Sequence, residues 1–132
     1  MFDWSNPEPG LYILHFSGDL SEQEQESFLS LLDRLSALST PYAALMTSEG
    51  NSPLSPDNKK RMNAWFKQNR EHMATWCHGH VRVQPGFTED HYEGSNLAKA
   101  LPFPLKAAST YEEGLVLART LLQRQTKEIQ GA

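Results

Sequence analysis

The sequence predicts a single α/β domain with a mostly parallel sheet of four or five strands and helices mainly on one face of that sheet. Short runs of strand-forming residues alternate four times with stretches whose apolar residues recur every three or four positions. Such alternation is typical of parallel strands joined by right-handed helical crossovers. If consecutive strands are also neighbours in the sheet, the helices fall on the same side, and the other face is left partly open.

Length and composition agree with one globular domain over residues 1–132. Of these residues, 39% are hydrophobic and 21% are charged, which excludes the disordered and collagen-like classes. No apolar run approaches the ~20 residues that span a bilayer, and the N-terminus lacks the pattern of a signal peptide. A single cysteine suits a reducing compartment. We therefore expect a cytoplasmic protein without a membrane span.

The N-terminal part of the chain predicts an edge strand followed by a strand–helix unit. Residues 2–5 are expected to form the edge strand, antiparallel to its neighbour, and residues 6–10 a turn rich in proline and glycine. A strand at residues 11–17 precedes a helix that Ser21 and Glu24 open as a capping box. The apolar stripe of this helix consists of Phe28, Leu31, Leu32, Leu35 and Leu38.

The middle of the chain predicts a central strand and a long amphipathic helix. Residues 42–47 are apolar at both alternating sets of positions, as in a strand covered on both faces. Ser55 is expected to cap the helix, with Pro56 at its first position, where a missing N–H costs nothing. One face of this helix, which runs to residue 76, carries Met62, Trp65, Phe66, Met73 and Trp76.

The strand predicted at residues 77–84 alternates in polarity, which indicates one buried and one exposed face. Its small or apolar positions are Cys77, Gly79, Val81 and Val83. His78, His80 and Arg82 would project together from the open face of the sheet. They are either simply solvated or form a contact surface for an acidic partner or an anionic head group, because arginine binds carboxylates and phosphates through paired hydrogen bonds.

The C-terminal part predicts a short helix, a short strand and a final helix. These are expected at residues 95–100, at residues 105–108 and after a second capping box formed by Thr110 and Glu113. The buried face of the last helix consists of Leu115, Ala118, Leu121 and Leu122. The tail at residues 126–132 is expected to fray.

Charge is unevenly distributed along the chain. Residues 1–58 carry nine acidic side chains and one basic one, whereas residues 59–82 carry six basic side chains and one acidic one. The simple interpretation places an acidic first helix beside a basic second helix. A nucleic-acid patch is the alternative, but the net charge is −4 and no strand interleaves aromatic and basic residues, so we expect no nucleic-acid partner.

The chain contains no motif of a common catalytic class, such as a phosphate-binding glycine loop or a nucleophile elbow. Cys77 and His78 would lie on opposite faces of a strand, which argues against a shared metal ion and against a Cys–His dyad. His91 lies among acidic residues of an expected solvated loop. We therefore expect no metal, no cofactor and no enzymatic activity, with Cys77 acting as a small buried hydrophobe.

Four stretches carry a resemblance to a known family: the WFKQNRE segment at residues 65–71, Cys-His-Gly at residues 77–79 before a strand, Leu-Pro-Phe-Pro at residues 101–104, and the capped TYEE at residues 110–113. Together they are similar to small bacterial STAS-like or CRAL-TRIO-like domains of unassigned function. The resemblance covers most of residues 10–123 and implies a SpoIIAA-like superhelix of βα units. STAS relatives bind protein partners, and CRAL-TRIO relatives bind lipids.

The sequence departs from this family at several positions. His80 and Arg82 stand where similar sequences have small or apolar residues, and Gly114 stands where they favour alanine. The regulatory stretch of the anti-sigma-factor antagonists is missing, and only Ser55 holds a place comparable to the STAS phosphorylation site. We expect Ser55 to act as a helix cap.

Two functional hypotheses follow. The first is a non-enzymatic STAS-like protein–protein interaction or regulatory module in the bacterial cytoplasm, which binds a partner protein or a second copy of itself. The alternative is a binder of a small apolar or amphipathic, lipid-like ligand, held between the helical layer and residues 87–103. The residues assigned to partner or ligand contact are His78, His80, Arg82, Phe87 and Phe103.

Overall fold

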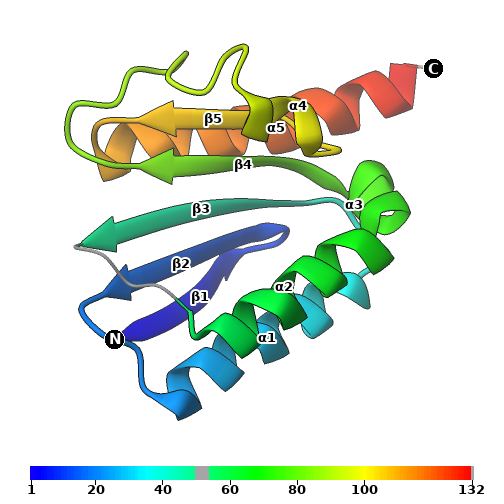
Figure 1. The fold of residues 1–132 in the computed structure, drawn as a ribbon. Helices are drawn as coiled ribbons and strands as arrows, with labels where there is room; N and C mark the ends of the chain where they lie inside the picture. Colours follow the sequence, from blue (N-terminus) through cyan, green and yellow to red (C-terminus); the bar gives the residue numbers. More distant parts are fainter. Residues whose placement is uncertain (50–53, 132) are drawn as a thin grey trace.

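The computed structural model describes residues 1–49 and 54–131, with side chains up to residue 123. Its core is a five-stranded sheet in the order β1-β2-β3-β4-β5, shown in Figure 1. The first pair of strands is antiparallel and the other pairs are parallel. The strands are β1 (Phe2–Glu8), β2 (Leu11–Ser17), β3 (Tyr42–Glu49), β4 (Cys77–Val83) and β5 (Leu105–Ala108). The predicted α/β fold class is confirmed.

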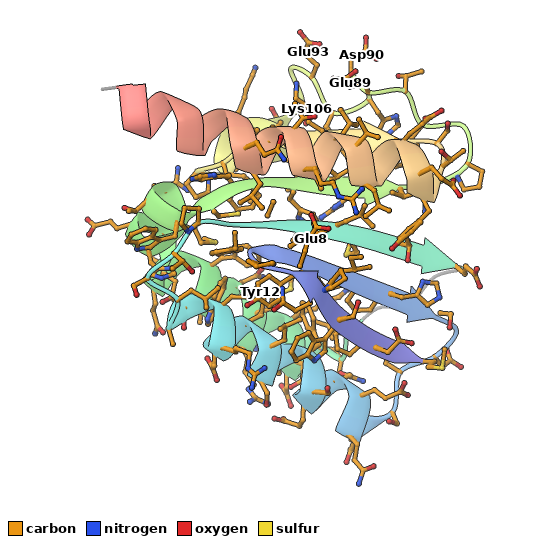
Figure 2. All side chains as sticks on the ribbon, turned by 180° about the vertical axis from the view of Figure 1, so that it is seen from behind. Glu8, Tyr12, Glu89, Asp90, Glu93 and Lys106 are labelled. Carbon is orange, nitrogen blue, oxygen red and sulfur yellow. The ribbon has the colours of Figure 1, made fainter. Side chains whose placement is uncertain are left out.

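The helices are α1 (Glu22–Ser36), α2 (Pro56–Gln68), α3 (Arg70–Trp76), α4 (Asn96–Ala100) and α5 (Tyr111–Gly131). Helices α1 and α2 lie on one side of the sheet, as Figure 1 shows, whereas α5 crosses the strands on the other side, as Figure 2 shows. Most helices therefore share one face. The opposite face, expected to be partly open, is covered by α5 over β3 and β4, whereas Ile13 and His15 of β2 stay partly exposed on it. Helix α5 follows the last strand and is not a crossover, so the handedness rule does not hold it on the side of the other helices.

Two apolar clusters fill the two sides of the sheet. The larger joins α1, α2 and α3 to β1 and β2, and includes Phe16, Phe28 and Trp65. The smaller lies beneath α5 and consists of Leu11, Leu45, Val81, Val83, Ala108, Ala118 and Leu121. Because β3 and β4 supply side chains to the second cluster, α5 covers apolar surface that would otherwise face water.

A β-bulge at the start of β4 breaks the alternation that the sequence predicts there. Tyr42 pairs with Cys77 but Ala43 pairs with Gly79, so that His78 is an extra residue. Cys77 belongs to the larger cluster, whereas a Cβ atom on Gly79 would meet Leu121 of α5. An extra residue shifts the side-chain alternation by one position. The prediction that Cys77 shares a face with Gly79 is therefore wrong.

The predicted long helix is divided at Asn69. The backbone N–H of Asn69 and its side-chain Nδ2 both donate to the carbonyl oxygen of Trp65, each at 2.9 Å. This side-chain bond ends α2, and α3 begins at the next residue. The separation turns the chain towards β4 while keeping Trp65 and Met73 in the larger cluster.

The start of α2 agrees with the sequence. Ser55 is the N-cap, and its side chain accepts a hydrogen bond from the backbone N–H of Asn58 at 3.2 Å. The backbone N–H of Ser55 donates to Oε1 of the buried Gln25 at 3.0 Å, which joins α1 to α2. Arg61 of α2 also forms an ion pair with Glu26 of α1. The acidic first helix therefore lies beside the basic second helix, as predicted.

Replacing Ser55 with alanine is expected to lower the free energy of unfolding by about 1 kcal/mol, because the N–H of Asn58 loses its acceptor. A urea titration followed by circular dichroism measures the change. Ser30→Ala is the matched control: Ser30 is exposed within α1, where alanine favours the helix. An unchanged or increased stability of Ser55→Ala would contradict the capping role.

Both ends of the chain extend the predicted elements. Strand β1 continues to Glu8, past a register shift between Ser5 and Glu8 that accommodates Pro7 at the sheet edge. The predicted turn at residues 6–10 is therefore confined to Pro9 and Gly10. Helix α5 runs to Gly131. Fraying of residues 126–132 stays a prediction, since residue 132 and the side chains from 124 onward lie outside the description.

The second capping box is present in half. The backbone N–H of Glu113 donates to Oγ1 of Thr110 at 3.2 Å, but the carboxylate of Glu113 accepts from the hydroxyl of Ser109 at 2.9 Å.

Among the described residues, no helix is both long and apolar enough to cross a membrane.

Candidate functional site

A strip of β3 and β4 lies partly exposed on the face that carries α1 to α3. The residues of this β3–β4 strip are Ala44, Met46 and Ser48 of β3 with His80 and Arg82 of β4, and each is intermediate in exposure. Ala44 pairs with His80 and Met46 pairs with Arg82, so the side chains lie side by side. Ala44 and Met46 also pack against the larger apolar cluster. The strip is thus a partly exposed surface whose residues Ala44 and Met46 are held in place by packing against the larger cluster.

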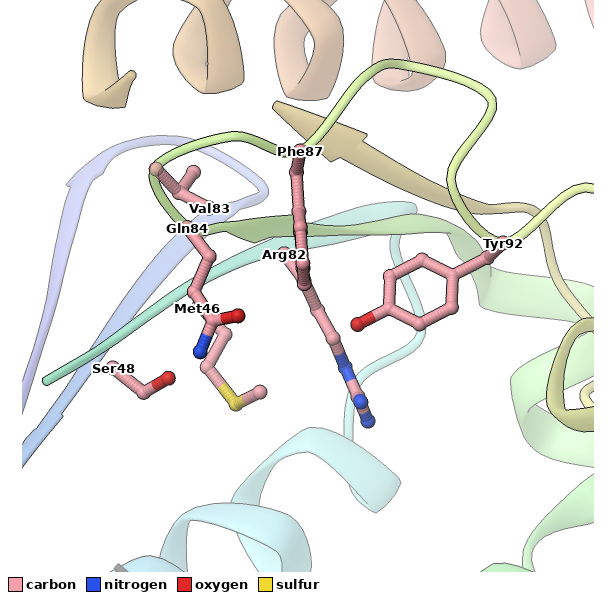
Figure 3. A pocket seen from close by; sticks show the side chains of 7 residues that line it. All are labelled: Met46, Ser48, Arg82, Val83, Gln84, Phe87 and Tyr92. Carbon is pink, nitrogen blue, oxygen red and sulfur yellow. The ribbon is translucent and has the colours of Figure 1, made fainter. Parts of the chain in front are cut away.

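A pocket of about 80 Å³ lies at the carboxyl end of this strip. Figure 3 shows its lining, which consists of Met46, Ser48, Arg82, Val83, Gln84, Phe87 and Tyr92. The first five come from the ends of β3 and β4 and the residue that follows β4, and the last two from the loop before α4. The carboxyl ends of parallel strands are the usual place for ligands in open α/β sheets.

Arg82 is the charged group of the pocket. Its guanidinium carbon lies 5.5 Å from the centre of the Tyr92 ring, which holds the cation over the aromatic face. Its Nε atom is buried and has no hydrogen-bond partner. Among the described residues, no carboxylate forms an ion pair with Arg82. Arg82 is therefore a cation whose position is set by an aromatic ring and whose charge no carboxylate of the described residues neutralises.

His80 lies beside Arg82 on the same face and differs from an ordinary solvated histidine. Its Nε2 atom is buried without a hydrogen-bond partner, and its ring centre lies 6.3 Å from that of Phe103. Burial, with a smaller contribution from the charge of Arg82, lowers the pKa of His80 from 6.5 to about 3. His80 is consequently neutral near pH 7.

The lowered pKa of His80 predicts a loss of stability in mild acid. In the unfolded chain this side chain takes up a proton near pH 6.5, whereas in the folded chain it stays neutral down to about pH 3. The contribution of His80 to the free energy of unfolding is therefore complete above pH 6.5 and decreases as the pH falls below that value. Between pH 7.5 and 5 the free energy of unfolding should decrease by about 2 kcal/mol from this group. Denaturant titrations at both pH values measure the decrease.

His80→Asn should remove most of this pH dependence. Ser30→Ala is the control, because Ser30 is exposed in α1 and its replacement removes no titratable group, so the dependence should stay as in the parent protein. An equal pH dependence in the parent and in His80→Asn would show that His80 titrates normally in the folded state.

The structure brings four of the predicted contact residues to one side of the sheet. His80 and Arg82 belong to the strip, Phe87 lines the pocket and Phe103 packs against the larger cluster beside His80. His78 is not among them: it is 1% exposed, and its Nδ1 lies 3.0 Å from the carbonyl oxygen of Leu122 in α5. The bulge at β4 causes this difference, and the prediction that His78 projects with His80 and Arg82 is wrong. His80 and Arg82 themselves project from the face that carries α1 to α3, so the prediction that they lie on the face without helices is also wrong.

Five pocket residues escaped sequence reasoning: Met46, Ser48, Val83, Gln84 and Tyr92. Met46 lies in a predicted strand whose two faces look equally covered in the sequence, Ser48 follows the predicted end of that strand at residue 47, and Gln84 follows the end of β4. Tyr92 is the one with a usable signal, because it is an isolated aromatic residue within a polar, acidic loop. Ser55 lies at the start of α2, where its hydroxyl is engaged as the cap.

The other side chains of potentially reactive type are unreactive or do not form a site. Burial raises the pKa of the Cys77 thiol to about 12 and also raises the pKa of Tyr42, its neighbour. Cys77 is therefore a protonated, buried thiol. Within the described part of the chain, no three His, Cys, Asp or Glu side chains lie close enough to hold a metal ion.

The acidic loop before α4 is solvated. Glu89, Asp90 and Glu93 are exposed and point away from the sheet in Figure 2. The hydroxyl of Thr88 donates to Oδ1 of Asp90 at 2.6 Å, and the His91 ring stacks on Phe87 with centres 3.9 Å apart. These contacts order the loop and hold Phe87 at the pocket.

Comparison with solved structures identifies the architecture. The chain is similar to an uncharacterized protein of the DUF3478 family from Shewanella loihica PV-4, whose structure is described as having a SpoIIAA-like fold. The TM-score is 0.58 at 12% sequence identity, over 89% of this chain and 92% of the other. This chain has a SpoIIAA-like fold. No family model and no curated protein matches the sequence.

The SpoIIAA-like fold accounts for the place of the site. Its βα units bring the carboxyl ends of the parallel strands to one edge of the sheet, and the pocket lies at the ends of β3 and β4. The neighbour in Shewanella has no assigned activity, so its likeness defines the fold and leaves function to the residues of this chain.

Proposed function

We propose that this SpoIIAA-like domain is a non-enzymatic interaction or regulatory module that contacts a partner protein through the β3–β4 strip and the pocket at its end. The observation that carries the proposal is Arg82, a partly exposed cation that no described carboxylate neutralises. An arginine oriented over an aromatic ring is a frequent anchor of protein interfaces. Its neighbours Met46 and Phe87 supply apolar contact area around the charge.

The size of the pocket favours a protein partner over the alternative lipid-like ligand. Pockets that enclose small molecules have volumes of roughly 300–1,000 Å³, whereas the volume here is about 80 Å³. An acyl chain needs an apolar tunnel, but this lining includes Arg82, Gln84 and Ser48. A single side chain of a partner suits such a space better.

The state of the titratable groups supports a non-enzymatic role. A general acid or base works best with a pKa near the operating pH, and the pKa of His80 is lowered to about 3. The Cys77 thiol is protonated and buried. Neither side chain is poised for proton transfer or nucleophilic attack near pH 7.

The test is an affinity capture from an extract of cells that express the protein, with three versions as bait. Arg82→Glu should lose partners that the parent retains, and Lys67→Glu should keep them, since Lys67 is exposed on α2 and the change in charge is the same. Circular dichroism verifies that both variants fold. If Arg82→Glu does not fold, Arg82→Gln replaces it as the test variant. Identical retained sets for all baits would overturn the proposal, as would native mass spectrometry that finds a stoichiometric lipid.

A further inference from the structure

The pocket contains one formal charge and several neutral polar groups. Arg82 supplies the charge, and Ser48, Gln84 and Tyr92 supply two hydroxyl groups and an amide. In Figure 3 the Tyr92 hydroxyl points towards the Arg82 side chain, and the Gln84 amide lies on the other side of Arg82. Each neutral group carries an O–H or N–H that can donate a hydrogen bond to an acceptor oxygen. The set is suited to an acceptor that carries negative charge.

The surrounding residues leave the charge of the pocket at +1. His80, the other basic group of the strip, is neutral near pH 7 because burial lowers its pKa to about 3. The acids of the nearby loop, Glu89, Asp90 and Glu93, point away from the sheet into solvent (Figure 2). A single positive charge is balanced by a monoanion, whereas a phosphate group would bring a charge of about −1.5 to −2 at pH 7.

We propose that the pocket binds one carboxylate group of the partner protein, held by the guanidinium of Arg82 and by the polar side chains beside it. The inference rests on the proposed function for the source of the carboxylate. Because Nε of Arg82 is buried, the accessible donors are the two Nη groups. This end-on pair matches the two oxygens of a carboxylate, and the Tyr92 ring holds the guanidinium plane in place.

The experiment is a nuclear magnetic resonance titration of the labelled protein with three small probes. N-acetylglutamate amide carries a side-chain carboxylate, N-acetylglutamine carries a terminal carboxylate, and N-acetylglutamine amide carries none but has the same shape. The Nε–Hε signal of Arg82 and the side-chain amide signals of Gln84 report on the pocket. A fourth titration uses inorganic phosphate.

Millimolar binding of at least one carboxylate probe, with shifts at both reporter groups and none from the neutral amide, is the expected result. The two carboxylate probes distinguish an acidic side chain from a chain end as the source. Arg82→Lys should weaken binding at least about tenfold, since lysine keeps the charge but not the paired donors. Lys67→Gln, which removes one exposed charge on α2, should bind as the parent does.

Equal shifts from the neutral amide, tighter binding of phosphate than of carboxylate, or no shift at Arg82 with any carboxylate would overturn the inference. The comparison of the acid and amide probes uses the parent protein alone, so it holds even if a variant fails to fold. Carboxylate binding together with unchanged partner capture by Arg82→Glu would support the pocket and refute the proposed function. Loss of partner capture by Arg82→Glu, without carboxylate binding by the parent protein, would support the proposed function and refute the carboxylate pocket.

Discussion

Trp65→Ala is expected to lower the free energy of unfolding by about 3–5 kcal/mol, the largest single effect in this protein. Trp65 is 8% exposed and lies in the larger apolar cluster, with its ring centre 5.2 Å from that of Phe66 in an edge-to-face arrangement. Removal of the indole leaves a cavity between α2 and the sheet that the surrounding elements fill only in part. A denaturant titration followed by circular dichroism measures the loss.

Trp65→Phe is the matched control for this prediction. The indole Nε1 is buried without a hydrogen-bond partner, so phenylalanine removes an unsatisfied donor while it keeps much of the volume. This variant should be clearly more stable than Trp65→Ala. A loss below about 1 kcal/mol for Trp65→Ala would contradict the placement of Trp65 in the core.

Gly114→Leu is expected to cost about 3 kcal/mol, because the substitution overfills the cluster beneath α5. Even a single Cβ atom at Gly114 would lie 2.6 Å from Cγ2 of Val83 and 3.0 Å from Cδ1 of Leu45. Leu45 is fully buried, so neither neighbour has free space into which to move. The same titration measures the change.

The smaller substitution Gly114→Ala decides between two physical effects. Helix propensity alone would stabilise the alanine variant by about 1 kcal/mol, whereas the close approach of α5 to β3 and β4 should make it less stable than the parent. Thr120→Ala at an exposed position of α5 shows the propensity effect without the clash. A stabilised Gly114→Ala would mean that α5 does not pack as closely as described.

The candidate site was only partly predictable from the sequence. Arg82, His80, Phe87 and Phe103 stand out because polar or aromatic residues interrupt otherwise apolar or weakly patterned segments, and all four lie near the β3–β4 strip. Strand alternation with a period of two predicts that His78 projects with them. A bulge has no such local signature, since it depends on the register between two strands that are far apart in the chain.

The sequence by itself determined most of the local elements and their order along the chain, and the SpoIIAA-like fold is what the family resemblance implies. Capping groups such as Ser21 and Ser55, apolar periodicity and proline or glycine breaks act within a few residues, so they can be recognised without knowing the fold. The end of α2 at Asn69 is a local event, a side-chain bond to Trp65 four residues earlier, which the apolar periodicity does not reveal. Only the tertiary structure decided that α5 covers the second face of the sheet and that β4 begins with a bulge. It also decided that Tyr92 meets Arg82. Each of these depends on contacts between distant parts of the chain, where burial and packing outweigh local preference.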